Sequence, residues 1–159
     1  MPLLLDNINI EDIKLDNVNI DVVNVNDVEV WKRIIPGTTW TQSTLPVVGC
    51  WFVTYGNGMF VAVNGYSRST DIAATSPDGI TWTQRTLPVS SNWYSVTYGN
   101  GMFVAIPSFT GTHNIVATSP DGVTWTKRTL PAYAGLLSVT YGNGMFVAVS
   151  SSDIVFTST

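Results

Sequence analysis

The chain has 159 residues, of which 45% are hydrophobic and 11% charged. This composition excludes an intrinsically disordered chain and allows one domain with a substantial core, or a domain with a short arm. The net charge is −4 and the sequence contains no basic stripe, so no nucleic-acid partner is expected.

The first residues and the single cysteine bear on where the protein is made. The opening MPLLLDN has no basic residue before its short apolar run, so it does not read as a Sec signal peptide. No apolar run approaches the length that spans a bilayer, and no membrane partner is expected. Cys50 is alone, so no intrachain disulfide is expected. These features predict assembly in a cytoplasm.

Residues 1–35 are predicted to form an acidic, β-rich arm. In residues 6–30, Ile, Leu and Val fill the third and fifth places of five successive pentads, from DNINI to NDVEV. A five-residue step suits neither a helix nor one flat strand, because the apolar face reverses at each pentad. Five pentads are too few to bury these side chains alone. We therefore expect the arm to dock on copies of itself or on another protein.

Residues 36–159 contain three copies of one unit. The segment VTYGNGMFVA begins at Val53, Val96 and Val139, so the copies repeat every 43 residues. A fixed period of this size indicates a repeat architecture, in which each unit buries its apolar face against its neighbours.

Each copy is predicted to contain four short antiparallel strands. Asn-Gly between apolar residues favours a two-residue type I′ hairpin, and Pro-Asp-Gly marks a second turn. In the second copy these turns separate YSVTY, MFVAI, NIVAT and VTWTK, and a linker of the type RTLPVSSNW joins successive copies. The pattern predicts an all-β fold of three β-propeller blades. A β-trefoil or β-prism, closed within one chain, is the alternative that the period leaves open.

The second turn of each copy carries a recognisable motif. TSPDGITW (Thr75–Trp82) and TSPDGVTW (Thr118–Trp125) resemble the Asp-box of sialidase-type propellers, and residues 38–159 resemble the repeats of bacterial and phage propeller-like proteins. The resemblance implies that the motif holds a hairpin turn together away from any active site. An Asp carboxylate that accepts backbone N–H bonds and a Gly with a permissive backbone suit that role. The structural turn residues are expected to be Ser76, Asp78, Gly79, Trp82, Ser119, Asp121, Gly122 and Trp125.

The end of the arm carries a second resemblance. Its last residues, VNVNDVEVWKR, resemble a short strand–turn–strand that ends in Val-Trp-Lys in phage tail-associated proteins. This resemblance implies a virion protein whose residues 1–35 contact other virion proteins.

A sialidase-like hydrolase is the weakest of the functional hypotheses. Such an enzyme needs an arginine cluster, a tyrosine nucleophile and an acid. After the arm the arginines are Arg68, Arg85 and Arg128, and the last two occupy equivalent places in different copies. His113, the only histidine, is predicted to be a solvated loop residue. We expect no enzyme, no cofactor and no metal site.

Aromatic residues between each TLP segment and the following VTY strand are candidate ligand contacts. Exposed aromatic side chains stack on sugar rings, which makes a surface glycan a candidate partner. The alternative is that these side chains pack between blades. Residues 64–71 and 107–114 differ between the first two copies, which suits a recognition surface and also an unconstrained loop. The candidate ligand-binding residues are Trp51, Trp93, Tyr94 and Tyr133.

The repeats begin and end in mid-unit. PGTTWTQ (Pro36–Gln42) matches the fourth strand DGITWTQ, and the chain ends in DIVFTST, which is a third strand. An exposed edge strand is an aggregation hazard, and three blades are too few for a propeller ring. We therefore expect TTWTQ of one chain to complete the last blade of the next. Two chains would form six blades and three would form nine, so the protein itself is the expected partner, as a homo-dimer or homo-trimer.

The sequence thus predicts a non-enzymatic structural protein of a tailed-phage virion, of tail, fibre or decoration type. Its distal domain, residues 36–159, is expected to bind a host-surface glycan or receptor. The alternative is an oligomeric carbohydrate-binding lectin assembled from partial propellers.

Overall fold

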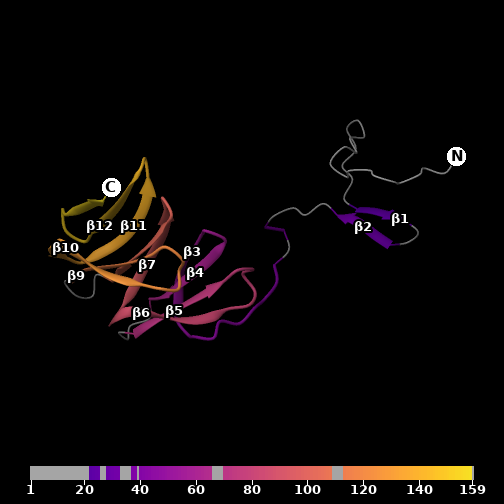
Figure 1. The fold of residues 1–159 in the computed structure, drawn as a ribbon, viewed down its shortest axis with the longest axis horizontal. Coiled ribbons are helices and arrows are strands. Elements are labelled where there is room, and N and C mark those ends of the chain that lie inside the picture. Colours follow the sequence, from indigo (N-terminus) through magenta and orange to yellow (C-terminus); the bar gives the residue numbers. More distant parts are fainter. Residues whose placement is uncertain are drawn as a thin grey trace. The chain divides into compact units, whose positions relative to one another are not determined.

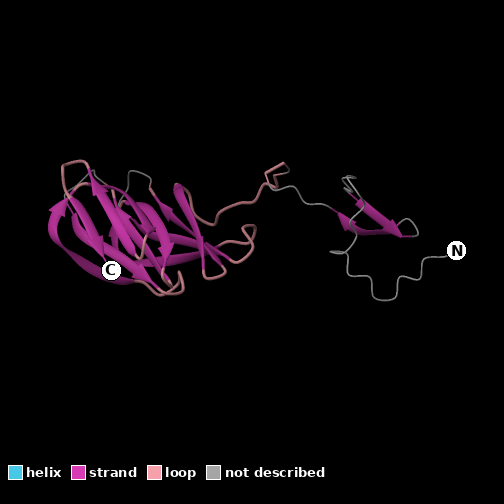
Figure 2. Ribbon diagram, turned by 90° about the horizontal axis from the view of Figure 1, so that it is seen from above, coloured by secondary structure: helices cyan, strands magenta, loops and turns pink. Residues whose placement is uncertain are grey.

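The computed structural model describes residues 22–25, 28–32, 37–38, 40–65, 70–108 and 113–158. Of Trp51 and of the two strands before residue 33 it describes the backbone alone. The chain divides into two compact units, Met1–Thr41 and Gln42–Thr159. Throughout the described residues the regular structure is β-strand, with no helix, which confirms the all-β class (Figures 1 and 2). The same residues therefore contain no helix that is long and apolar enough to cross a membrane.

The described residues of the first unit include one hairpin. Strand β1 (Val22–Val25) pairs antiparallel with β2 (Val28–Lys32), with Val22 opposite Lys32. This confirms the strand–turn–strand predicted for the end of the arm. The pentads before residue 22 lie outside the described residues.

The second unit is a series of three antiparallel sheets, in each of which consecutive strands pair in chain order. Sheet 1 contains β3 (Cys50–Gly56), β4 (Met59–Asn64), β5 (Thr70–Ser76) and β6 (Thr83–Ser91). Sheet 2 contains β7 (Trp93–Gly99), β8 (Met102–Pro107), β9 (His113–Ser119) and β10 (Thr126–Ala134). Sheet 3 contains β11 (Leu136–Gly142), β12 (Met145–Ser150) and β13 (Val155–Ser158).

The first hairpin of every sheet turns at Asn-Gly, as predicted. Asn57, Asn100 and Asn143 have φ angles of 47°, 45° and 48°, and the glycine after each also has a positive φ. A type I′ turn requires positive φ at both central residues, which Asn and Gly tolerate best. The repeated local sequence therefore fixes the register of β3–β4, β7–β8 and β11–β12.

The segment predicted to link successive copies is a strand instead. β6 and β10 continue through Thr-Leu-Pro, and a register shift lets four residues bulge out before the strand ends. Pro88 and Pro131 are tolerated there because β6 and β10 are the edge strands of their sheets, where a missing N–H breaks no ladder bond. The linker prediction was wrong because the edge position of this segment is a property of the whole sheet.

Apolar side chains pack in the two spaces between sheets. The first inter-sheet core joins sheets 1 and 2, and its buried members include Val61, Val63, Ala73, Val96, Phe103, Ala105, Ala117 and Trp125. The second inter-sheet core joins sheets 2 and 3, and its buried members are Val104, Ile106, Ala134, Leu136, Val139, Ala148 and Phe156. Sheet 2 therefore packs against a neighbour on both of its faces.

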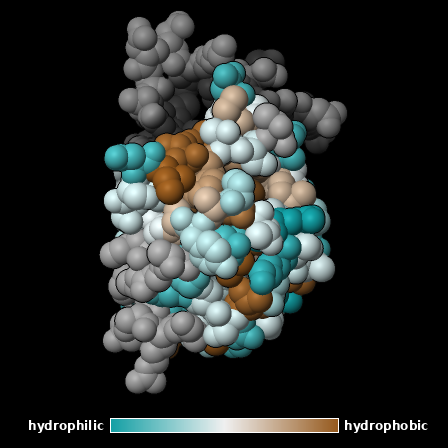
Figure 3. Space-filling model, turned by 90° about the vertical axis from the view of Figure 1, so that its left-hand side faces the viewer, coloured by the Kyte–Doolittle hydropathy of each residue, from teal (hydrophilic) through white to brown (hydrophobic). Residues whose placement is uncertain are grey.

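Sheet 3 has three strands in the described part of the chain, and β13 is its last strand. TTWTQ (residues 38–42), which was predicted to complete the last blade of another chain, is not a strand at residues 40–42, nor are residues 43–49. A strand exists only with a pairing partner, and this segment pairs with no strand among the residues that the structure describes. Figure 3 views the end of the unit that carries sheet 3, where apolar patches interrupt the polar surface.

Candidate functional site

The turn after β5 is held by one serine and one aspartate. The Ser76 hydroxyl donates to Asp78 Oδ1 at 2.8 Å, and the amide of Gly79 donates to Ser76 Oγ at 2.8 Å. The amides of Ile80 and Thr81 donate to Asp78 Oδ1 at 2.8 and 2.7 Å. One carboxylate oxygen thus gathers three donors, which explains why the motif needs Ser and Asp at this spacing.

A glycine and a tryptophan complete the turn. Gly79 has a φ of 74°, and its carbonyl accepts a 3.1 Å hydrogen bond from Trp82 Nε1. The bond fixes the indole at the start of β6, beside the Phe60 ring.

The turn after β9 repeats this geometry. Ser119 donates to Asp121 at 2.9 Å, and Trp125 Nε1 donates to the Gly122 carbonyl at 3.0 Å. The amides of Val123 and of the next residue both donate to Asp121 Oδ1 at 2.8 Å. The turn role that the resemblance implied for these residues is therefore seen in both copies.

These bonds keep both carboxylates ionised. The Thr81 amide, followed by the Ile80 amide and the Ser76 hydroxyl, holds the pKa of the Asp78 carboxyl well below its usual range. The Thr124 amide lowers the pKa of Asp121 in the same way, against a smaller opposing effect of burial. Ionised carboxylates occupied by turn bonds are poorly suited to donate a proton near neutral pH.

Residues 37–40 form the second half, Gly and Trp, of a third turn of this kind. Gly37 has a φ of 81°, and its carbonyl accepts a 3.0 Å hydrogen bond from Trp40 Nε1. This is the Gly–Trp bond of the two complete turns, which confirms that the segment is equivalent to DGITW. Yet the Trp40 side chain is 86% exposed, whereas the equivalent Trp125 is 9% exposed.

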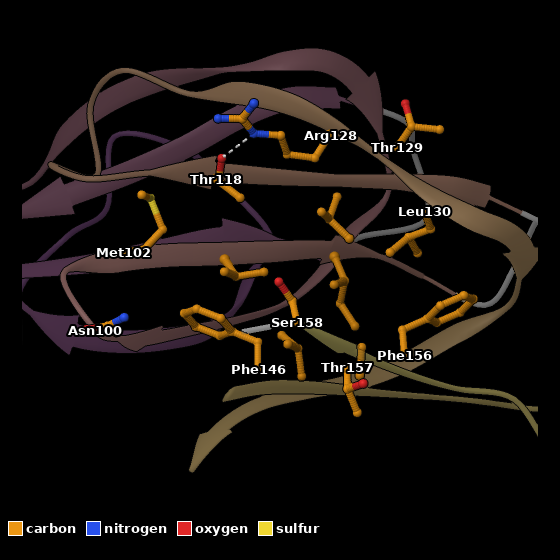
Figure 4. Close-up of a pocket in the computed structure, with 15 residues that line it drawn as sticks. Asn100, Met102, Thr118, Arg128, Thr129, Leu130, Phe146, Phe156, Thr157 and Ser158 are labelled. Atoms are coloured by element: carbon orange, nitrogen blue, oxygen red, sulfur yellow. Dashed lines mark hydrogen bonds between the residues drawn. The ribbon is translucent and has the colours of Figure 1, made fainter. Parts of the chain in front are cut away.

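A cavity of about 540 Å³ lies between sheets 2 and 3. Met102 and Leu130 from sheet 2 face Phe146 and Phe156 from sheet 3 across it (Figure 4). Val104, Ile106 and Ala148 add to its apolar lining, and Asn100, Thr118, Arg128 and Ser158 contribute polar atoms. The cavity is thus lined mainly by apolar side chains, with several polar groups among them.

The chain matches no protein-family model and no curated protein. Among solved structures it is similar to the crystal structure of the computationally designed Ika4 protein, with a TM-score of 0.39 and 8% identity, over 75% of this chain and 98% of that chain. A likeness this distant carries no argument about function.

The three candidate ligand-binding aromatics whose side chains the structure describes do not form one platform. Trp93 is fully buried in the first inter-sheet core, where its Nε1 donates to the Val89 carbonyl at 3.1 Å, as the packing alternative expected. Tyr94 is half-buried, and its ring lies 4.7 Å from the Phe52 ring. Tyr133 is 65% exposed on β10, at the opposite edge of sheet 2 from β7. The side chain of Trp51 lies outside the described residues.

The residues considered for an enzyme have separate places in the fold. Arg85 donates to Thr75 at 2.9 Å and Arg128 donates to Thr118 at 3.2 Å, each between neighbouring strands of its own sheet. His113 is the first residue of β9 rather than a loop residue, because it pairs with β10. Arg68 lies outside the described residues. Nowhere in the described ranges do three or more His, Cys, Asp or Glu residues gather as metal ligands would.

Sequence reasoning missed a contact between tyrosine and glycine that joins the sheets. An added Cβ on Gly56 would fall in the Tyr98 ring, and one on Gly99 would fall in the Tyr141 ring. The signal was the Tyr-Gly pair repeated in every VTYG segment. Gly142, the third such glycine, has nothing within 4 Å, and Tyr55, the first such tyrosine, is 57% exposed.

Proposed function

We propose that this protein is a non-enzymatic structural component of a tailed-phage virion, of tail, fibre or decoration type. Its three sheets act as propeller-type blades, its residues 1–35 dock on other virion proteins, and its repeat domain contacts a glycan or receptor on the host surface. The observation that carries the proposal is the use of the repeated residues. The Asp-box Ser, Asp, Gly and Trp all serve the turns, and the repeated Asn-Gly pairs all serve the hairpins.

A scaffold of this kind leaves recognition to the residues that differ between copies. Residues 64–71 and 107–114 differ in the first two copies, while the hairpins beside them are nearly identical. A rigid framework that carries variable connections is a common arrangement for recognition. The phage assignment is supported by the resemblance of the repeats and of the Val-Trp-Lys hairpin to phage proteins.

Particles purified from a phage that encodes the chain provide the test. Mass spectrometry of gradient-purified virions should detect the chain in stoichiometric amount with the other structural proteins. Its presence only in the infected-cell lysate, and not in the particles, would rule out a virion role.

A lectin is the second candidate, and the exposure of Tyr133 favours it, because an exposed ring offers a face for a sugar. A glycan array probed with the full chain tests this, with Tyr133→Ala and Tyr94→Ala as variants and Ile80→Ala, an exposed residue outside the candidate set, as control. Saturable binding lost in the tyrosine variants alone would support a lectin site. No binding to any glycan would leave the architectural role.

A further inference from the structure

We propose that sheet 3 is completed by a second copy of this chain. Residues 40–49 of that copy pair with β13, its Trp40 enters the cavity between sheets 2 and 3, and its Tyr55 lies against Gly142. The contact is head-to-tail and uses only residues of this chain, so it does not depend on where the protein acts.

The interface between sheets 1 and 2 shows what fills the equivalent place. There the turn after β9 packs on sheet 1: an added Cβ on Gly122 would lie 2.7 Å from Val61 and 3.7 Å from Thr75. Trp125, three residues later, is buried in the first inter-sheet core. One repeat further on, Val61 and Thr75 become Val104 and Thr118, and both line the cavity. The cavity therefore stands where a turn with its glycine and tryptophan belongs.

The chain holds the two separated halves of such a turn. Sheet 3 ends at Ser158, which corresponds to Ser119 of the complete turn and also lines the cavity (Figure 4). Gly37 and Trp40 supply the other half, already joined by the hydrogen bond that Gly122 and Trp125 make. The exposed indole of Trp40 is thus already oriented for the cavity, which is the site equivalent to the one in which Trp125 is buried.

The Asn-Gly hairpin turns also indicate that the cavity is the place for an incoming turn. Asn57 donates through Nδ2 to the Pro120 carbonyl of the next sheet at 3.3 Å, which ties the turn after β9 to sheet 1. Asn100, the equivalent residue of sheet 2, lines the cavity instead. The polar group that would hold an incoming turn is therefore in place.

The two ends of the sheet series carry complementary surfaces. Val53 at the first end is 60% exposed, whereas the equivalent Val96 is 8% exposed against sheet 1. At the last end Val149 is exposed, whereas the equivalent Val63 is fully buried against sheet 2. Each end shows half of an interface that the molecule forms twice internally. A second copy is therefore the occupant that fits both.

Because of the chain connectivity, the copy whose residues 40–49 pair with β13 also supplies the contacts of Trp40 and Tyr55. A single residue separates β6 from β7 and β10 from β11, so the last strand of each sheet leads directly into the first strand of the next. Residues 40–49 lead into β3 in the same way, and the Gly65 amide donates to the Gly49 carbonyl at 3.0 Å. Ser108 and Asn92 form the equivalent bond at 2.6 Å. A copy that completes sheet 3 therefore places its own sheet 1 beside it.

The same chain does not supply the segment. Asn64 Nδ2 donates to the Val48 carbonyl at 2.7 Å, and Ser43 donates to the Gly79 carbonyl at 3.4 Å. Both bonds hold residues 43–49 at sheet 1, and sheet 2 separates sheet 1 from sheet 3 (Figure 1).

The internal repeats also predict the register of the new strand pair. Thr126 lies opposite Thr118 in sheet 2, and Thr83 lies opposite Thr75 in sheet 1. The equivalent pair is Thr41 of one copy opposite Thr157 of the other. A disulfide trap tests this pair: full-length chain with Thr41→Cys and Thr157→Cys, in a Cys50→Ser background, should form covalent dimers or larger species on mild oxidation. The matched control is Thr118→Cys with Thr126→Cys, which should link within one chain.

Two further variants test the anchors. Trp40 is exposed and Gly142 has open space, so Trp40→Ala and Gly142→Ala leave the single chain folded. Each should weaken association by more than about tenfold, as expected for a buried tryptophan anchor and for a blocked close contact. Tyr133→Ala, outside the interface, should associate as the wild type does. Mixing the Trp40 and Gly142 variants restores one intact junction and should yield a pair.

Interchain disulfides that disappear with Trp40→Ala or Gly142→Ala support the proposal. A link within a single chain would overturn it in favour of closure within one molecule. The absence of any link, while the Thr118–Thr126 control forms, would overturn it as well. A wild-type protein that sediments only as a 17.3 kDa species at micromolar concentration is the third contrary outcome.

Discussion

The ring of Tyr98 occupies the space in which a side chain at Gly56 would begin. Sheets 1 and 2 therefore meet without room for a Cβ at this position. Gly56→Ala should force the ring and the backbone apart and lower the free energy of unfolding by about 1–3 kcal/mol, as overpacking does in well-packed cores. Urea denaturation followed by tryptophan fluorescence would record the loss as a lower midpoint.

The double variant Gly56→Ala/Tyr98→Ala identifies the cause. If ring overlap is responsible, the two substitutions together should cost less than the sum of their separate effects, because removing the ring makes room for the methyl group. Additive effects, or a wild-type midpoint for Gly56→Ala alone, would be inconsistent with the close contact.

The sequence was most informative where the chemistry is local. Asn-Gly hairpins at Asn57, Asn100 and Asn143 and the Ser-x-Asp-Gly turns depend on residues within a few positions of each other. Such features can be read from a short segment, and both predictions were confirmed. The contacts between sheets join residues of different copies that lie far apart in the sequence, so a single copy of the repeat does not reveal them.

Trp93 shows what a comparison between copies adds. It lies five residues before Tyr98, in the place that Cys50 and Leu136 hold in the other copies. Leu136 is also fully buried, so the position belongs to the core in two copies. The aromatic ring alone made Trp93 a candidate for ligand binding. Its alignment with the buried Leu136 indicates instead that it is a packing residue.

Trp125 is buried in the first inter-sheet core, and its indole N–H also donates a hydrogen bond within the turn after β9. Trp125→Ala should reduce the free energy of unfolding by about 3–5 kcal/mol, because it leaves a cavity and removes the indole N–H bond. Tyr133→Ala, an exposed control, should change it by less than about 0.5 kcal/mol. Thermal or urea unfolding of the wild type and the two variants measures these losses of stability. Equal losses in both variants would contradict the burial of Trp125.

Cys50 occupies the position in the first copy that is equivalent to Trp93 and Leu136 in the other two. Burial raises the pKa of its thiol. Because the thiolate is the reactive form, Cys50 should react with a disulfide reagent more slowly than a free thiol at pH about 8. Unfolding in urea should restore the rate of a free thiol. Absorbance of the released chromophore measures both rates. A native rate equal to the unfolded rate would show that the thiol is accessible and not desolvated.

The turn carboxylates make the fold sensitive to acid. In the unfolded chain an Asp titrates near pH 3.9, and the turn amides place the pKa values of Asp78 and Asp121 lower in the folded protein. The stabilisation is therefore fully present above the unfolded pKa. It decreases as the pH falls below about 4 toward the folded values, because the unfolded state then binds more protons.

Asp78→Asn and Asp121→Asn, combined in one variant, test this coupling. Asparagine keeps an oxygen acceptor at the same place and removes the charge, so the variant should be less stable than the wild type at neutral pH. The difference should shrink as the pH is lowered from about 5 to about 2, because the wild-type carboxylates become protonated in the unfolded state over that range while the turn amides keep them ionised in the folded state. Chemical denaturation at a series of pH values measures it. Asp71→Asn, a charge change in β5 outside both turns, is the control. A difference that is constant across this range would mean that the turn bonds stabilise the fold without discriminating the ionised carboxylate.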